Sequence, residues 1–185
     1  MNWKKVLLRT LGVIVILYLG LVIYRIPAVA EKKRTEAAVA RIHAQKLTLD
    51  TVMGKNLPPS PDQVRNDSTI EGIDANANGI RDDVELAIFK KYPNSPKQRA
   101  PELQYAMALQ REFTEVFNSE TLVAVMQEQG RGYLCISEDK NIEQVENLIF
   151  NTEKRKQWRE EIYKKYMTSF KLSNEQKCDI APSSL

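Results

Sequence analysis

Apolar and polar positions divide the chain into four parts. Residues 10–24 are uncharged and consist mainly of Leu, Val and Ile, and they follow a short basic start that contains Lys4, Lys5 and Arg9. An apolar stretch with a basic front at the N-terminus is typical of an export signal. The pattern therefore predicts a signal peptide or a signal-anchor helix over residues 1–30.

Two fates of this leader are open. Ala28 and Ala30 are small residues at the two positions that a signal peptidase reads, and Pro27 would break a helix just ahead of them, which favours cleavage after Ala30. Arg25 is an unfavourable charge so close to a cleavage site. If the flanking arginines reach the membrane surface, residues 6–26 provide 21 residues, and about 20 span a bilayer as a helix. We favour the uncleaved anchor.

Two polar segments follow the leader. Residues 31–54 mix alanines and a few larger apolar residues with charges, which predicts a polar juxtamembrane helix, and we expect His43 in it to be exposed. Residues 55–68 hold three prolines and no apolar periodicity, and consecutive prolines lack the donors that helices and sheets require. This segment is predicted to be a linker. The folded domain is expected to begin near Thr69 and to extend over residues 69–185.

The C-terminal part has the three- and four-residue apolar spacing of buried helix faces. Asn118 is expected to break or recap a helix, Thr152 to cap the last one, and Ser95 to open a capping box. Gly130 and Gly132 are expected to mark a turn. No segment alternates strictly between apolar and polar residues, so no sheet is predicted. We predict an all-α domain of about four helices, whose apolar stripes lie within residues 82–92, 103–117, 122–126, 142–149 and 158–170.

The two cysteines, Cys135 and Cys178, agree with export. An isolated pair behind an export signal is expected to form a disulfide, whereas in a cytosolic protein the same residues would be inert buried thiols. On the chain-entropy estimate, closing this loop stabilises the domain by about 4 kcal/mol. The bond would tie the chain ahead of a helical hairpin at residues 141–170 to the tail behind it.

The charge distribution argues against one class of partner. The net charge is +3, but residues 1–30 carry four basic and no acidic residues, which leaves 23 basic and 24 acidic residues in the rest of the chain. A near-neutral domain lacks the basic footprint that nucleic acid requires, so we expect no nucleic-acid partner. Clusters such as Lys154-Arg155-Lys156 have glutamates close by, and we expect them to be solvated helix faces.

Residues 74–85 carry the candidate chemistry. Their sequence, Asp-Ala-Asn-Ala-Asn-Gly-Ile-Arg-Asp-Asp-Val-Glu, satisfies every specified position of the calcium-loop pattern D-x-[DN]-x-[DN]-G-x5-E. Calcium takes roughly six to eight oxygen ligands, which a tight loop supplies from alternate residues. Gly79 provides the sharp turn at position 6, where a Cβ would be costly. The expected ligands are the side chains of Asp74, Asn76, Asn78, Asp82 (directly or through water) and Glu85, and the main-chain carbonyl of Ile80.

A metal-free interpretation explains part of this loop. Acids at positions 82, 83 and 85 would lie in the first turn of a helix, where they interact favourably with the helix dipole and the free amides. Asn, Asp and Gly ahead of them are ordinary turn residues. This interpretation does not explain the acceptors at the alternate positions 74, 76 and 78, so we prefer calcium. Because the formal ligand charge is about −3, we expect weak binding, with a Kd of roughly 10⁻⁴ to 10⁻³ M.

The loop resembles the calcium loops of EF-hand-like bacterial surface proteins, dockerins and thrombospondin type 3 repeats. The resemblance covers 12 residues, or 16 if residues 71–73 and Leu86 are added. Two features depart from the EF-hand. The apolar residue is Ile80 at position 7, as in type 3 repeats, whereas position 8 is Arg81, and the proline segment takes the place of a preceding helix. The resemblance therefore implies a one-sided loop-helix without the two-helix lever of a calcium sensor.

Three functions are open at this stage. The first is a non-enzymatic cell-envelope protein, whose calcium loop and disulfide stabilise a small helical module that binds an unidentified envelope protein. It would be anchored with its domain outside the cytoplasm, or periplasmic or secreted if the leader is cleaved. The second is an envelope hydrolase with Asp and Glu as acid and base, although pairs such as Glu112 and Glu115 resemble solvated helix surface. The third is a calcium sensor. One histidine and two cysteines speak against a nucleophilic triad or a zinc site.

Overall fold

The structure is a computed structural model that describes residues 3–136, 139–172 and 177–185. Its internal contacts divide the chain into two compact units, Met1–Ala37 and Ala38–Leu185. The described residues form eight α-helices and one short 3-10 helix, and no strand occurs among them. The prediction of an all-α protein is thereby confirmed.

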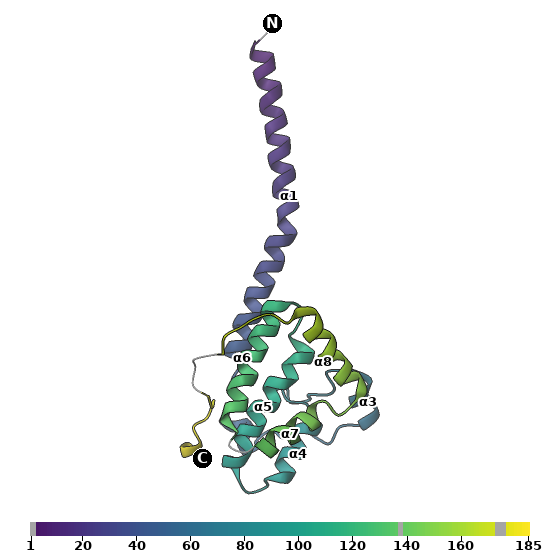
Figure 1. The fold of residues 1–185 in the computed structure, drawn as a ribbon, viewed down its shortest axis with the longest axis vertical. Coiled ribbons are helices and arrows are strands. Elements are labelled where there is room, and N and C mark those ends of the chain that lie inside the picture. The colour runs from purple at the N-terminus through teal and green to yellow at the C-terminus, as the bar shows by residue number, and fades with distance from the viewer. Residues whose placement is uncertain (1–2, 137–138, 173–176) are drawn as a thin grey trace. The chain divides into compact units, whose positions relative to one another are not determined.

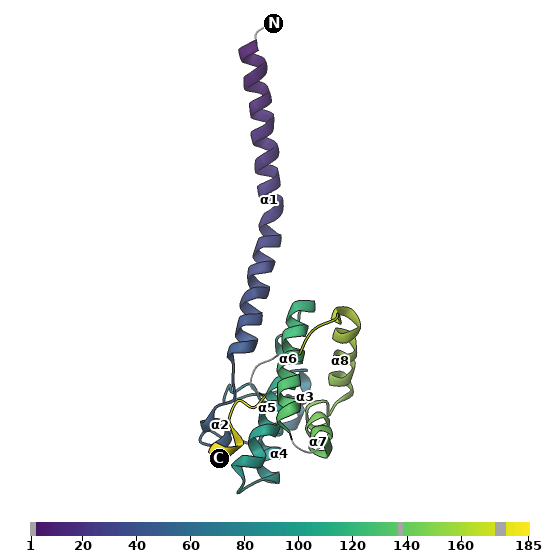
Figure 2. The ribbon, with the colours of Figure 1, turned by 60° about the vertical axis from the view of Figure 1, so that its left-hand side comes forward.

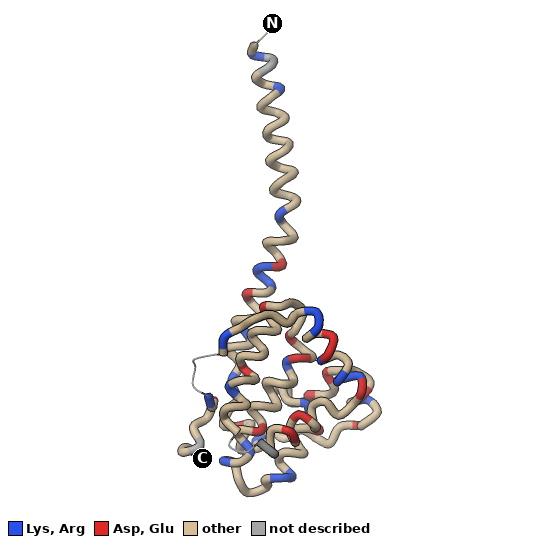
Figure 3. Tube along the Cα trace, viewed as in Figure 1, with Lys and Arg blue, Asp and Glu red and all other residues tan. Residues whose placement is uncertain are grey.

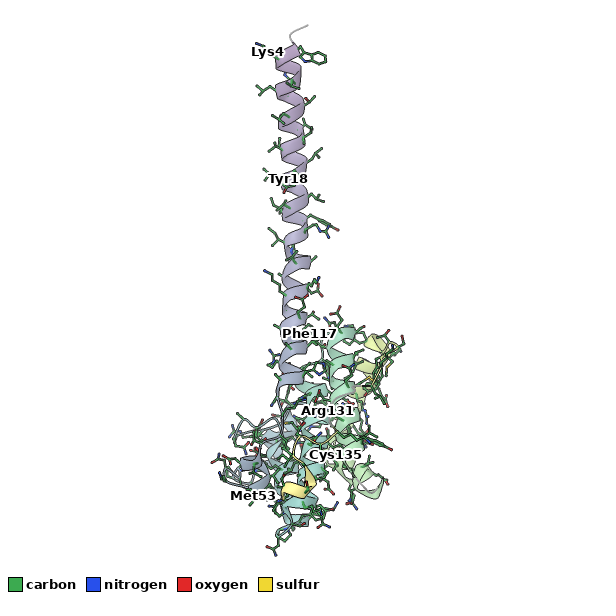
Figure 4. The ribbon with its side chains drawn as sticks, turned by 90° about the vertical axis from the view of Figure 1, so that its left-hand side faces the viewer. Lys4, Tyr18, Met53, Phe117, Arg131 and Cys135 are labelled. Atoms are coloured by element: carbon green, nitrogen blue, oxygen red, sulfur yellow. A yellow bond between two sulfur atoms is a disulfide. The ribbon has the colours of Figure 1, made fainter. Side chains whose placement is uncertain are left out.

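Helix α1 (Trp3–Ala44) begins in the first unit and ends in the second. Its segment Leu7–Ala44 is long and apolar enough to cross a membrane, a property that an N-terminal signal sequence shares. Figure 3 shows the basic residues near its start, then a long uncharged stretch, and charges of both signs further on. Apolar side chains such as Tyr18 project from it into open space (Figure 4). Pro27 lies inside the helix without ending it, as proline can in membrane-crossing helices.

Helix α5 is the central element of the second unit, where it packs against α2, α4, α6 and α7 (Figure 1, Figure 2). Its side chains Leu103 and Leu109 are fully buried in the main core, together with Ile80, Val84 and Ile88 from the candidate loop and the helix after it. The elements after α1 are α2 (Leu49–Met53), α3 (Gln63–Ser68), α4 (Asp82–Lys91), α5 (Pro96–Thr114), α6 (Ser119–Cys135), α7 (Asp139–Ile149), α8 (Glu153–Tyr166) and the 3-10 helix Pro182–Ser184.

The second unit begins at Ala38, well ahead of the expected start near Thr69. Ile42, Leu47 and Val52 are buried, so the segment after α1 contributes to the hydrophobic interior. The proline segment is also partly helical: the side chain of Asp62 caps α3 by accepting a hydrogen bond from the amide of Arg65. A few buried apolar residues among many polar ones give little periodicity, which is why the sequence alone placed this segment outside the domain.

Local capping signals are reproduced with one exception. Asn118 and Thr121 form a reciprocal capping box at the start of α6, and Thr152 caps α8. Ser95 occupies the N-cap of α5 with Pro96 in the first turn, but its side chain makes no capping hydrogen bond, so the expected box does not form. Helix α8 ends at Tyr166, short of the expected residue 170.

The turn expected at Gly130 and Gly132 is wrong, because both residues lie inside α6. A Cβ placed on Gly132 would lie 2.9 Å from the Cα of Tyr105 in α5. The absence of a side chain therefore lets α5 and α6 approach closely. A glycine that serves packing and one that serves a turn look the same in a single sequence.

The expected disulfide between Cys135 and Cys178 is present. Arg131 and Cys135 lie one turn apart on α6 (Figure 4), and both hold the C-terminal tail. The carboxylate of Asp179 accepts hydrogen bonds from Arg131 at 2.7 Å and from the amide of Leu47, just after α1, at 2.9 Å. The tail therefore joins the end of α6 to the end of α1.

Candidate functional site

The candidate loop lies between α3 and α4, and its last four residues form the first turn of α4. Two residues have left-handed backbone conformations, Ala77 with φ 55° and Gly79 with φ 86°. Glycine adopts this conformation at little cost, and a Cβ on Gly79 would also lie 2.7 Å from Nε2 of Gln45. The predicted role of Gly79 in a sharp turn therefore agrees with its geometry.

Three of the predicted ligand side chains meet at one point. The Nδ2 of Asn76 donates to Oε2 of Glu85 at 3.0 Å, and the Nδ2 of Asn78 donates to Oε1 of Glu85 at 2.9 Å. Positions 3, 5 and 12 of the loop pattern are thus brought together, with each oxygen of Glu85 accepting a hydrogen bond from one of the two asparagines.

The other two predicted carboxylate ligands accept hydrogen bonds from main-chain amides of the loop. Asp74 accepts hydrogen bonds from the amides of Asn78 at 3.2 Å and Gly79 at 2.8 Å. Asp82 is buried and accepts from the amide of Ala75 at 2.9 Å. The side chain of Ile80 is buried in the main core, and its amide donates to Oδ1 of Asn78 at 2.8 Å.

The carboxylates of the loop lie in an unfavourable electrostatic environment. Burial raises the pKa of Glu85, and the nearby charges of Asp74 and Asp82 raise it further, against the hydrogen bonds from the two asparagines. Burial also raises the pKa of Asp82. Among the described residues, no three His, Cys, Asp or Glu side chains come together in an arrangement that would hold a metal ion. Any cation here would therefore depend on the asparagine and main-chain oxygens as well.

Arg81, at position 8 of the loop, anchors it to α7. The side chain is fully buried, and its guanidinium donates to the last carbonyls of that helix, Leu148 at 2.6 Å and Ile149 at 3.1 Å. A cation at this end of a helix also interacts favourably with the helix dipole. Asp83 balances its charge. At the position where an EF-hand has an apolar residue, this loop thus has an arginine that caps the end of α7.

Arg155 holds the chain that leads into the loop. The charge pattern predicts a solvated helix face at Lys154-Arg155-Lys156, but the side chain of Arg155 is 0% exposed. Its guanidinium donates to the carbonyls of Asn66 at 2.8 Å and Ile70 at 3.0 Å, and to the carboxylate of Asp67. Arginine can be buried here because its five donors satisfy acceptors from a distant segment.

A short helix does precede the loop, which corrects the expectation that only the proline segment does. Helix α3 ends at Ser68, and residues 69–73 separate it from Asp74. It therefore does not run directly into the loop. The amide of Ile73 donates to the buried side chain of Asn66 at 2.9 Å, which links the helix to the start of the loop.

Glu112 is a buried carboxylate, which corrects the prediction that it lies on solvated helix surface. It is 0% exposed, and it accepts hydrogen bonds from Gln129 at 2.7 Å and from the hydroxyl of Tyr163 at 3.2 Å. Burial raises its pKa, which the charge of Arg159 partly opposes. Burial also raises the pKa of Tyr163 to about 12. The carboxylate is enclosed by these partners, so a substrate does not reach it.

We expect Glu112→Gln to change the pH dependence of stability. The folded protein keeps the proton of Glu112 to a higher pH than the unfolded chain does, where the pKa is about 4.3. Stability contributed by this group is therefore present at low pH and is lost as the pH rises through the folded-state pKa. The variant should gain stability relative to the wild type above pH ~4.3, by at most about 1.4 kcal/mol per pH unit.

Urea unfolding of the full chain in detergent, at a series of pH values, measures this difference. Glu160→Gln, an exposed carboxylate on α8, is the matched control and should show no such trend. A constant difference between Glu112→Gln and the wild type across the range would contradict the raised pKa.

A second cluster of charges surrounds Glu128 on α6. It accepts from His43 at 2.8 Å, from Lys46 at 3.2 Å and from Arg131. Burial alone would raise the pKa of Glu128, but the hydrogen bond from His43 and the two cations outweigh it and lower the pKa. His43, which was expected to be exposed, is therefore partly buried in an ion-pair cluster that fixes the end of α1 to α6.

No protein-family model matches the chain, and comparisons with curated proteins and with solved structures find no match. The function must therefore be argued from the residues themselves. Two contacts of the loop had no sequence signal, those of Gln45 and Asn56, since each depends on a side chain or a main-chain carbonyl far from the loop in sequence.

Proposed function

We propose that residues 74–85 bind calcium and that the protein is a non-enzymatic component of the cell envelope. In this proposal, calcium and the disulfide stabilise a small helical module that binds another protein. The observation that carries the calcium proposal is the meeting of Asn76 and Asn78 on the two oxygens of Glu85. The left-handed Gly79 beside them supports it.

The chemistry of the loop favours calcium over other cations. All candidate ligands are oxygens, and the loop has no sulfur or imidazole, so softer metals are disfavoured. Calcium tolerates the irregular geometry of carboxylate, amide and carbonyl oxygens, whereas magnesium requires a near-ideal octahedron. A cation would also offset the mutual repulsion of Asp74, Asp82 and Glu85, the three acids of the ligand set.

The location supports a weak site. The chain has an N-terminal helix suited to an anchor or a signal, and its two cysteines form a disulfide. Disulfides persist in oxidising compartments outside the cytoplasm. Calcium-binding modules of extracellular proteins have Kd values of roughly 10⁻⁴ to 10⁻³ M. Such an ion acts as a staple, because it binds the folded state and not the unfolded chain.

Two alternatives have less support. A hydrolase needs an acid and a base that a substrate can reach, and the buried Glu112 is enclosed. A sensor needs two helices that separate around the loop, and α3 ends at Ser68 without entering it.

We expect calcium to raise the melting temperature of the full chain in detergent. At about 5 mM calcium, a site with the expected Kd contributes about 1 to 2 kcal/mol, which corresponds to roughly 2 to 8 °C relative to chelator. Asp74→Ala and Glu85→Gln should each remove the shift. Glu71→Gln, an exposed acid beside the loop, should retain it.

Three results would count against parts of this proposal. If the wild type melts at the same temperature in calcium and in chelator, residues 74–85 do not bind calcium as proposed. Calcium-dependent binding of a hydrophobic dye would favour the sensor. If envelope extract yields no partner that binds the wild type in calcium and is lost with Asp74→Ala, the interaction role fails.

A further inference from the structure

The segment after α1 lies directly against the candidate loop. The Nδ2 of Asn76 donates at 2.8 Å to the main-chain carbonyl of Asn56, twenty positions earlier in the chain. Thr48, Asp50, Thr51 and Asn56 line one side of a cavity of about 240 Å³, and the loop residues 76–78 and Glu85 line the other. The loop and this segment thus line the same cavity.

The segment is also fixed to the helices that continue from the loop. Val52 is fully buried, and its carbonyl accepts two hydrogen bonds from the guanidinium of Arg99 in α5. Gly54 ends α2 in a left-handed conformation with φ 72°, and a Cβ there would lie 2.8 Å from the ring of Phe89 in α4. A displacement of Gly54–Asn56 would therefore disturb the packing of α4, which also carries Glu85.

We propose that Asn76 is a positioning residue that couples cation binding in the loop to the order of residues 48–56. This inference rests on the proposed calcium site. In the structure, Nδ2 of Asn76 is shared between Glu85 and Asn56. Because Nδ2 carries two hydrogens, both bonds are made at once. A cation held by Oδ1 of Asn76 and by Glu85 would act by holding the Asn76 side chain in place, which makes its hydrogen bond to the Asn56 carbonyl more persistent.

The segment coupled to the loop follows the end of α1. Residues 48–56 follow α1 after the short connection at residues 45–47. Calcium in the loop would therefore stiffen the segment that follows the part of α1 packed in the second unit. The bound ion would stabilise more than its own loop.

Amide hydrogen exchange of the full chain in detergent tests the coupling. In wild-type protein, about 5 mM calcium should slow exchange in peptides covering residues 48–57 by roughly twofold to tenfold, the factor that corresponds to the free energy of one hydrogen bond made more persistent. If calcium raises the melting temperature but leaves exchange in this segment unchanged, the coupling is overturned and the calcium site stands. If calcium changes neither, the proposed function itself fails.

Asn76→Asp separates binding from coupling. Aspartate keeps an oxygen ligand and adds negative charge but has no N–H for the Asn56 carbonyl. Asn78→Asp is the matched control, because Nδ2 of Asn78 donates to Glu85 within the loop. Both variants add a carboxylate to the ligand set, so each should enlarge the calcium-dependent shift in melting temperature, and only Asn76→Asp should lose the slowed exchange in residues 48–57. Slowed exchange that survives in Asn76→Asp, or is lost equally in Asn78→Asp, would overturn the role of Asn76.

Discussion

Arg155→Met is expected to lower the free energy of unfolding by roughly 3 to 5 kcal/mol. The guanidinium is fully buried and serves the carbonyls of Asn66 and Ile70 and the carboxylate of Asp67. Methionine fills much of the volume but donates no hydrogen bond, so the carbonyl of the fully buried Asn66 would lose this partner and the partly exposed carboxylate of Asp67 would lose its cation. Each unsatisfied buried acceptor costs about 1 to 3 kcal/mol.

The same substitution should weaken the calcium effect. Arg155 fixes residues 66–70, which lead into the loop, and the loop must be held in shape to bind a cation at little cost in entropy. The calcium-dependent shift in melting temperature should therefore shrink in the variant. A residue that stabilises the domain without contacting residues 66–70 should lack this second effect.

Urea unfolding of the full chain in detergent measures the loss. Lys154→Gln is the matched control. Lys154 also donates to a carbonyl within residues 66–70, that of Ser68, but it does so at the exposed surface. It should change stability by less than about 1 kcal/mol. Equal losses in the two variants would mean that burial of the guanidinium contributes nothing.

Arg155 also illustrates what the sequence could not predict. Its neighbours Lys154 and Lys156 are exposed, as the charge pattern indicates. Whether a charged residue is buried depends on its partners, and those of Arg155 are main-chain carbonyls more than eighty positions away. Carbonyls carry no sequence signal. The buried Glu112 was missed for a related reason, because its enclosure is completed by Gln129 and Tyr163 from other helices.

The features that could be predicted are local. Helical periodicity, the caps at Asn118 and Thr152 and the loop pattern at residues 74–85 each depend on residues a few positions apart. The disulfide was predictable because the chain has two cysteines behind an N-terminal apolar stretch that is typical of an export signal. Contacts across the fold, such as the hydrogen bond from Asn76 to Asn56, could be found only once the chain was placed in three dimensions.

Removal of the disulfide is expected to have an effect of similar size. Replacing both Cys135 and Cys178 by serine should lower the free energy of unfolding by about 4 kcal/mol, because the unfolded chain regains the freedom of a long loop. Urea unfolding of the double variant and the wild type, both without reductant, gives the difference. Adding reductant should lower the stability of the wild type to that of the variant and should leave the variant unchanged.

The structure adds a local consequence to this loss. Asp179 follows Cys178, and its carboxylate joins Arg131 on α6 to the amide of Leu47 after α1. Without the sulfur bond, the tail is held at this end by the hydrogen bonds of Asp179 and by those between Gln104 and residues 177 and 179. Proteolysis at residues 177–185 should therefore become faster in the double variant. If the tail stays protected while stability falls, the disulfide acts through the unfolded chain alone, and the contacts of Asp179 suffice to hold the tail.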